Sequence, residues 1–295
     1  MAEMLKIETG PGLIFDALAD GATGAPPVLL LHGFAESFHM WRSQLPALAA
    51  AGYRAVAPSQ RGYSPGARPD TTNFAQYHFD RLVADAMSIA DVSGYADRRF
   101  HLVGHDWGAS IAWGIADRYP DRLMSLTVLS RPHPNAFNRA LKMPDGEQAR
   151  RSRHHRDFLK ADAGAQLLAN DARWLRERLA KSGVPQDAIE QHISVLGSES
   201  AIEAALAWYR ARGAIRAPLG MISVPVLYVW GDADDTVGRT AAEGTAEFVA
   251  GPYQFEVLTG IGHFAAEQAP DRVNELLLTH LRVNGSSRPG TSMSR

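Results

Sequence analysis

The chain has 295 residues, of which 45% are hydrophobic and 21% are charged, and its formal net charge at pH 7 is -2. This composition is typical of a globular protein and excludes general disorder. A chain with so little net charge also lacks the basic field that holds nucleic acids and anionic membrane surfaces. Because the chain contains no cysteine, disulfide bonds, thiolate metal ligands and cysteine nucleophiles are excluded. Any nucleophile must therefore be an oxygen or a nitrogen.

The amino terminus and the most apolar segments indicate where the protein is expected to act. Residues 1–12 contain no apolar run behind a basic region, so we expect no secretory signal and a cytoplasmic location. The apolar runs 27–31 and 224–230 are far shorter than the roughly 20 residues of a membrane-spanning helix. We expect a small-molecule substrate, no nucleic-acid or membrane partner, and a monomer or homodimer.

Three short apolar runs, each followed by glycine and a polar residue, predict buried strands. They are Val28–Leu31, Phe100–Val103 and Val226–Trp230. Continuous apolar runs are typical of strands that are buried on both faces of a parallel sheet. Helical spacing of apolar residues predicts helices over 79–92 and 109–119, the second closed by Pro120. This alternation predicts an α/β fold with a mostly parallel sheet flanked by helices.

The pattern changes between residues 134 and 216, where strand-like runs vanish and helix-like segments dominate. We interpret this segment as an inserted helical cap over the carboxyl ends of the strands, where ligands of open α/β sheets bind. The predicted core then comprises residues 1–133 and 217–283. Residues 284–295, rich in Ser, Gly and Pro, are predicted to form a disordered tail.

The segment Gly104-His105-Asp106-Trp107-Gly108 lies between a predicted strand and a predicted helix. Small residues on both sides of a central residue permit the tight strand-to-helix turn called the nucleophile elbow, here with aspartate at its centre. An aspartate at this place is also a common helix cap. The segment alone leaves both interpretations open.

Two later segments complete a possible catalytic set. Asp232, Asp234 and Asp235 lie in an acidic loop after a predicted strand, and His263 lies between Gly262 and Phe264 after another apolar segment. Nucleophile, acid and histidine follow one another in the order expected of a catalytic triad on an α/β sheet. A helix-capping aspartate and a packing histidine are the alternatives.

With these motifs the chain resembles the α/β-hydrolase superfamily over nearly its whole length, and within it the aspartate-nucleophile branch of epoxide hydrolases and haloalkane dehalogenases. The segments that carry the resemblance, besides the elbow, are His32-Gly33-Phe34-Ala35-Glu36-Ser37, Arg61-Gly62-Tyr63-Ser64 and Trp208-Tyr209-Arg210. The resemblance implies an α/β-hydrolase fold with an inserted helical cap.

The resemblance also implies a role for individual residues. Asp106 is the expected nucleophile, His263 the base and Asp234 the acid, with Asp232 and Asp235 as alternative acids. Some relatives place the acid after the preceding strand, but that segment, 129–132, contains no carboxylate here. The backbone N–H groups of Phe34 and Trp107 are expected to form the oxyanion hole.

An aspartate nucleophile selects the kind of substrate. Its attack on an acyl carbon would give a high-energy anhydride, whereas its attack on a saturated carbon gives an ordinary ester. Esterase and amidase activities are therefore disfavoured. Water deprotonated by His263, with Asp234 orienting the imidazole, would then cleave the Asp106 ester.

Assistance to the leaving group separates the subclasses, because the oxygen of an opening epoxide needs a proton donor. Epoxide hydrolases commonly use two cap tyrosines. Tyr209 matches one by resemblance, whereas His154 occupies the other position and His155 is an alternative donor. Imidazole can donate near neutral pH, so we expect His154 and Tyr209 to act together. The expected substrate pocket is lined by Trp107, His155, Trp208 and Phe264.

These considerations predict a hydrolase that opens a small to medium, mostly apolar epoxide to a vicinal diol. A haloalkane or haloacetate dehalogenase with the same triad is the first alternative. Phe34 stands where haloalkane dehalogenases usually have a halide-binding Asn, although Trp174 and Trp208 offer N–H groups, and Trp107 stands where haloacetate dehalogenases have arginine. A ligand-binding protein on a hydrolase fold is the second alternative.

No cofactor or metal is expected. The histidines include no His-Glu-x-x-His arrangement on a helix, and no glycine-rich phosphate loop follows a predicted strand. The expected chemistry therefore rests on side chains and backbone groups of the chain itself.

Overall fold

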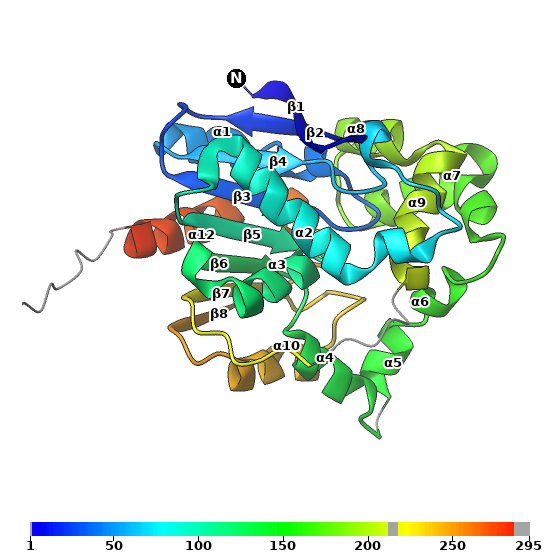
Figure 1. Cartoon of the computed structure of the whole chain (residues 1–295). Helices are drawn as coiled ribbons and strands as arrows, with labels where there is room; N and C mark the ends of the chain where they lie inside the picture. Colours follow the sequence, from blue (N-terminus) through cyan, green and yellow to red (C-terminus); the bar gives the residue numbers. More distant parts are fainter. Residues whose placement is uncertain (1, 145, 212–217, 286–295) are drawn as a thin grey trace, which may run out of the picture.

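A central eight-stranded sheet organises the computed structural model, which describes residues 2–144, 146–211 and 218–285 (Figure 1). The strand order is β1-β2-β4-β3-β5-β6-β7-β8. β2 pairs antiparallel with both β1 and β4, and all the other neighbouring strands are parallel. The strands are β1 (Glu3–Gly10), β2 (Leu13–Asp20), β3 (Pro27–Leu31), β4 (Arg54–Pro58), β5 (Phe100–His105), β6 (Leu123–Leu129), β7 (Val226–Gly231) and β8 (Tyr253–Leu258). The predicted α/β class with a mostly parallel sheet is confirmed.

The three predicted strands are β3, β5 and β7, and every residue in them is buried. In contrast, buried and half-buried residues alternate along β2. Such alternation is typical of an antiparallel strand with only one face buried, and it gives no continuous apolar run. The two antiparallel strands at the amino terminus were therefore not predicted.

Helices cover both faces of the sheet, and alternate strand residues contact them. Val28 and Leu30 of β3 pack with apolar residues of α1 and α12 on one face. Leu29 and Leu31 pack with those of α2 and α3 on the other face. Because successive side chains of a strand point to opposite faces, one apolar run supplies both layers. The core helices are α1 (Gln44–Ala50), α2 (Phe79–Ala90), α3 (Trp107–Arg118), α10 (Arg239–Glu243), α11 (Ala265–Gln268) and α12 (Pro270–Gly285).

The described residues between β6 and β7 mostly form helices, as the helix-like spacing of residues in this segment predicts. It contains α4 (Pro134–Leu141), α5 (Glu147–Arg151), α6 (His154–Asp157), α7 (Ala163–Lys181), α8 (Gln186–Leu196) and α9 (Glu199–Arg210). Helices α6 to α9 lie beyond the carboxyl ends of the parallel strands (Figure 1). Positive φ angles at residues 170–172 interrupt the regular geometry of α7.

The ends of the predicted regions fall partly outside the described residues. Residues 212–217, at the predicted end of the insertion, and residues 286–295 of the predicted tail are not described. The first two residues of that tail, Asn284 and Gly285, belong to α12. Helix α12 therefore extends slightly beyond the predicted end of the core.

The shorter helical segments connect these elements, mostly as single turns. They are Phe38–Trp41, Pro65–Ala67, Phe74–Tyr77, Asp91–Tyr95, Pro120–Arg122 and Gly244–Phe248. Among the residues that the structure describes, no helix is both long enough and apolar enough to cross a membrane.

The turn from β5 into α3 requires glycine on both sides. A Cβ atom at Gly104 would lie 2.6 Å from the carbonyl oxygen of Gly108, and one at Gly108 would lie 2.2 Å from that of Leu31. Both neighbours are backbone atoms of packed elements, so neither can move easily. The glycine spacing of the predicted elbow is thus explained by the close approach of β3, β5 and α3.

Replacement of Gly108 by Ala is expected to destabilise the fold through this backbone overlap. Overpacking typically costs about 1–3 kcal/mol, and each kcal/mol lowers the melting temperature of a domain of 150–250 residues by roughly 2–4 °C. The measurement is thermal unfolding of the purified variant. Gly10→Ala is the control, because nothing lies within 4 Å of the added methyl group. Equal melting temperatures for the two variants would contradict the explanation.

Candidate active site

The elbow holds Asp106 in a strained conformation at the start of α3. Asp106 has φ 48° and ψ -112°, and its side chain makes no capping hydrogen bond to the described helix. Such a sparsely populated backbone conformation in a non-glycine residue typically costs about 1–3 kcal/mol, and it is found where function demands it. The structure therefore does not support the alternative in which Asp106 merely caps a helix.

Backbone and charged groups stabilise the Asp106 carboxylate. The backbone N–H of Phe34 donates to Asp106 Oδ1 at 3.2 Å. Burial raises the pKa of Asp106, but the charges of His263, His105 and Arg131 and a hydrogen bond from the Trp107 N–H outweigh burial and lower the pKa below its usual value. Asp106 is consequently ionised at neutral pH, as a carboxylate nucleophile must be. Phe34 and Trp107, the expected oxyanion donors, both direct N–H groups at this carboxylate.

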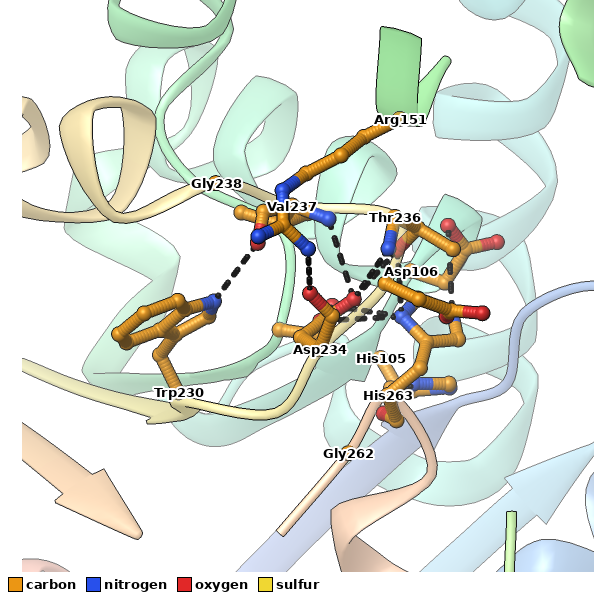
Figure 2. Close-up of polar contacts among 12 residues, drawn as sticks. His105, Asp106, Arg151, Trp230, Asp234, Thr236, Val237, Gly238, Gly262 and His263 are labelled. Atoms are coloured by element: carbon orange, nitrogen blue, oxygen red, sulfur yellow. Dashed lines mark hydrogen bonds and ion pairs between the residues drawn. The ribbon is translucent and has the colours of Figure 1, made fainter. Parts of the chain in front are cut away.

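His263 lies between the two aspartates Asp106 and Asp234 (Figure 2). Its Nε2 is 3.9 Å from Asp106 Oδ2, and its Nδ1 is 3.2 Å from Asp234 Oδ2. Of the three acidic residues after β7, Asp232 instead accepts the Gly260 N–H, and Asp235 pairs with Arg178. Asp234 is thus the acid that the structure brings to His263.

Asp234 is completely buried and richly hydrogen bonded. Its Oδ1 accepts the backbone N–H groups of Thr236 at 2.7 Å and Val237 at 3.0 Å, and its carbonyl oxygen accepts a hydrogen bond from Arg151. Burial raises the pKa of Asp234, but the charge and hydrogen bond of His263, together with bonds from Ser130 and Thr236, lower it far below the usual carboxyl value. Asp234 is therefore ionised and can stabilise positive charge on His263.

Two hydroxyl groups beside the triad were not predicted. Ser130 Oγ lies 2.6 Å from Asp234 Oδ2 and 2.9 Å from His263 Nδ1. Thr236 Oγ1 lies 2.8 Å from both Asp234 Oδ1 and His263 Nδ1. Ser130 directly follows β6, at the position where some members of the superfamily carry the acid. The triad pattern specifies a carboxylate at that position and no hydroxyl, so it did not predict the contacts of Ser130 with both residues.

A cavity of about 220 Å³ lies between the core and the insertion above Asp106. It is lined by Phe34, Ala35, Asp106, Arg151, His154, Phe158, Trp174, Arg178, Tyr209, Asp235, Thr236, His263 and Phe264. The predicted residues Tyr209, His154 and Phe264 belong to this lining. Phe158 and Arg178, from α7 and the segment before it, were missed, whereas Trp174 was named from the sequence only as an N–H donor to a halide.

Three residues expected in the pocket are not among the described residues that line this cavity. Trp208 donates its indole N–H to the Arg61 carbonyl at 3.0 Å and therefore faces the core. Trp107 packs edge-on against both Trp208 and Tyr209, with ring centroids 5.7 and 5.1 Å apart. His155 contacts the ring of Tyr209 at a centroid distance of 5.5 Å. These aromatic side chains support Tyr209 and do not form the wall of the cavity.

The structure also revises the expected role of His154. Its Nδ1 lies 3.1 Å from the Arg151 carbonyl oxygen, which can only accept, so Nδ1 carries the proton and Nε2 is an acceptor in the neutral ring. Burial, the largest influence, lowers the pKa of His154 to about 4. The ring is therefore neutral at pH 7, and the expectation that His154 donates near neutral pH is not supported.

One buried group of side chains, none of which lines the cavity, contains atoms of the types that bind metals. Atoms of Glu36, His192 and Glu267 lie within 4.8 Å of one another. However, the Ser37 N–H donates to His192 Nδ1 at 3.1 Å, so the proton of the neutral ring is on Nε2, the nitrogen nearest Glu267. Arg42 also pairs with Glu267 at 3.2 Å. These contacts do not fit a metal site and instead join α8 to the core.

Comparisons with known proteins agree with this geometry. The family model of the alpha/beta hydrolase fold matches residues 26–270. Epoxide hydrolase A of Mycobacterium tuberculosis is 33% identical over 305 residues, covering 88% of this chain and 92% of that protein. Epoxide hydrolase 4 of Homo sapiens is 30% identical, covering 92% of this chain and 76% of that protein.

Solved structures give the same result. The crystal structure of epoxide hydrolase A from Mycobacterium thermoresistibile has a TM-score of 0.81 and 28% identity, covering 96% of this chain and 98% of that one. A structure from a study of epoxide hydrolases in metagenomes from hot environments has a TM-score of 0.83 and 28% identity. The match covers 95% of this chain and 99% of that one. Together with the elbow and the residues around it, these matches show that the chain belongs to the α/β hydrolase superfamily, in its epoxide hydrolase-like branch.

Proposed function

We propose that the protein hydrolyses a small to medium, mostly apolar epoxide to a vicinal diol. The observation that carries this proposal is that the Asp106 carboxylate and the Tyr209 side chain line the same cavity. A carboxylate attacks saturated carbon, and a phenol supplies the proton that the opening ring oxygen requires. The similarity to proteins named epoxide hydrolases supports the same reaction.

In the first step, Asp106 Oδ2 attacks one carbon of the epoxide. Oδ1 is held by the Phe34 N–H, which leaves Oδ2 as the oxygen available for attack. A new C–O bond forms while the bond from that carbon to the ring oxygen breaks. The ring oxygen takes the phenolic proton of Tyr209, and the product is a hydroxyalkyl ester of Asp106.

In the second step, water attacks the carbonyl carbon of this ester while His263 Nε2 takes a proton from it. Charge develops on Oδ1, where the N–H groups of Phe34 and Trp107 stabilise it. Collapse of the tetrahedral intermediate releases the diol oxygen, which takes the proton from His263. The proton that remains on the Asp106 carboxylic acid returns through solvent to the Tyr209 phenolate. The net reaction is then one epoxide and one water giving one diol.

The cavity sets the size and polarity of the substrate. An apolar cavity of about 150 Å³ accommodates benzene, so a cavity of about 220 Å³ fits an epoxide somewhat larger than benzene. The side chains of Phe34, Phe158, Trp174 and Phe264 supply an apolar wall. We also propose that residues 134–216 act as the cap, because Tyr209, His154 and Trp174 all come from this insertion.

The geometry favours an epoxide over a halide as the leaving group. The Trp208 indole N–H is occupied by the Arg61 carbonyl, so it does not face a halide in the cavity. Phe34 offers no side-chain donor, and of the two tryptophans named from the sequence only Trp174 lines the cavity. A departing halide needs no proton, whereas the oxygen of an opening epoxide must take one, and the Tyr209 phenol in the same cavity can supply it. The intact set of Asp106, His263 and Asp234 likewise favours an enzyme over a ligand-binding protein.

Replacement of His263 by Gln is expected to stall the reaction after ester formation, because Gln cannot deprotonate the hydrolytic water. Intact-protein mass spectrometry after incubation with an epoxide that the wild type converts should show a mass increase equal to the epoxide. Asp106→Asn is the control and should show no increase. An unmodified His263→Gln protein would contradict the covalent mechanism.

Replacement of Tyr209 by Phe is expected to slow ester formation by about 10²–10⁴-fold, the usual contribution of a positioned proton donor. His154→Gln should slow it less than about tenfold at pH 7, because His154 is already a neutral acceptor there. Single-turnover measurement of diol and ester distinguishes the two variants. Parallel haloalkane reactions provide the comparison, since halide release that survives in Tyr209→Phe and exceeds diol formation would favour a dehalogenase.

A further inference from the structure

We infer that Ser130 and Thr236 are positioning residues for His263. Their hydroxyl groups, together with Asp234, hold the proton of the imidazole on Nδ1 and so keep Nε2 available to take a proton from water. This inference rests on the proposed function, because it concerns the step in which the Asp106 ester is hydrolysed.

The distances around Nδ1 place both hydroxyl groups closer than the carboxylate. His263 Nδ1 lies 2.8 Å from Thr236 Oγ1 and 2.9 Å from Ser130 Oγ, but 3.2 Å from Asp234 Oδ2. Each hydroxyl also contacts a different oxygen of Asp234, with Ser130 on Oδ2 at 2.6 Å and Thr236 on Oδ1 at 2.8 Å. Each carboxylate oxygen of Asp234 is therefore also linked to His263 Nδ1 through one hydroxyl group, Oδ2 through Ser130 and Oδ1 through Thr236.

Counting protons fixes the direction of these hydrogen bonds. An ionised carboxylate can only accept, so the single proton of each hydroxyl group points to Asp234. Only lone pairs of Ser130 and Thr236 then remain to face His263. Nδ1 is surrounded by three acceptors and must carry the proton. In the neutral ring the other nitrogen, Nε2, is then left with a lone pair, and it lies 3.9 Å from Asp106 Oδ2.

The backbone holds both hydroxyl groups firmly. Ser130 is only 2% exposed, its φ is 64°, and its carbonyl oxygen accepts the Tyr228 hydroxyl at 2.7 Å. Glycine adopts a positive φ at lower cost than serine, so the strained serine offers a hydroxyl at a place where glycine would fit more easily. Thr236 donates both its N–H and its hydroxyl to Asp234 Oδ1, which fixes its side chain as well.

Loss of either hydroxyl is expected to affect one half of the reaction more than the other. Ester formation needs Asp106 and Tyr209, whereas ester hydrolysis needs His263 with Nε2 unprotonated. Without Ser130 or Thr236, Nδ1 keeps fewer acceptors and the imidazole is less firmly oriented. The ester intermediate should therefore accumulate.

The experiment compares Ser130→Gly and Thr236→Val with wild type in single-turnover reactions on an epoxide that the wild type converts. Ser130→Gly removes the hydroxyl and relieves the positive φ, and Thr236→Val keeps the shape of the side chain. We expect ester hydrolysis to slow by about tenfold in each, the scale of one hydrogen bond, while ester formation changes less. Intact-protein mass spectrometry measures the ester, and diol formation measures its loss.

Two further variants serve as matched controls. Ser125, on β6, contacts another buried histidine, with its Oγ 2.7 Å from His101 Nδ1. Ser125→Ala therefore removes a serine–histidine contact of the same kind away from the cavity, and it should leave both rates as in wild type. Thr236→Ser restores the hydroxyl and should hydrolyse the ester faster than Thr236→Val.

Three results would overturn the inference. One is ester hydrolysis within twofold of wild type in both Ser130→Gly and Thr236→Val. The second is an equal loss of ester formation and ester hydrolysis together with a lower melting temperature, which indicates a structural role only. The third is Thr236→Ser being as slow as Thr236→Val. Failure of the proposed function is distinguishable, since then wild type forms no diol and His263→Gln forms no ester.

Discussion

The charge on Asp106 is the constraint around which the site is built. A carboxylate in a largely enclosed cavity must stay ionised, yet it must keep one oxygen unblocked if it is to attack carbon. The structure meets both conditions by placing the Phe34 N–H on Oδ1 and leaving Oδ2 facing His263 at 3.9 Å, beyond a direct hydrogen bond. The strained backbone of Asp106 keeps its side chain away from the helix N–H groups that a capping aspartate would occupy. The glycines at 104 and 108 let β3, β5 and α3 approach closely enough to produce that conformation.

The sequence predicted the core well because the core depends on local patterns. Apolar runs identified β3, β5 and β7, and the glycine spacing identified the turn that carries Asp106. The antiparallel strands β1 and β2 were missed because β1 is mostly exposed or half-buried and because buried and half-buried residues alternate along β2, so neither strand gives a continuous apolar run. Asp106, Asp234 and His263 meet because the strands that precede them end at the same edge of the sheet. That connectivity follows from the alternation of strands and helices, which the sequence pattern already shows.

The cavity lining was harder to predict because it depends on how the inserted helices face the core. Trp208 was expected in the pocket, but its indole N–H is satisfied by a core carbonyl, and the adjacent Tyr209 faces the cavity instead. Trp174 and Arg178 lie on α7 beyond the irregular residues 170–172, so periodicity measured along the whole helix gives no reliable face there. No pattern of residue types specifies these orientations.

The chemical state of His154 illustrates a second limit of sequence reasoning. The residue was expected at the correct wall of the cavity, where it does lie. Whether an imidazole donates or accepts is set by its surroundings, here by the Arg151 carbonyl and by burial. A residue type can therefore be placed in a site by its position in the chain while its role stays undetermined until its hydrogen-bond partners are known.

The two steps of the proposed reaction divide along the boundary between core and insertion. Ester hydrolysis uses Asp106, His263 and Asp234, all from loops that follow strands of the sheet. Ester formation also needs Tyr209, which α9 of the insertion supplies. Contacts such as the Arg178–Asp235 pair hold the insertion against the core, so the donor and the nucleophile meet only when the two parts are packed together. In the proposed mechanism, changes in α6 to α9 are therefore expected to alter which epoxide is opened more than they alter hydrolysis of the Asp106 ester.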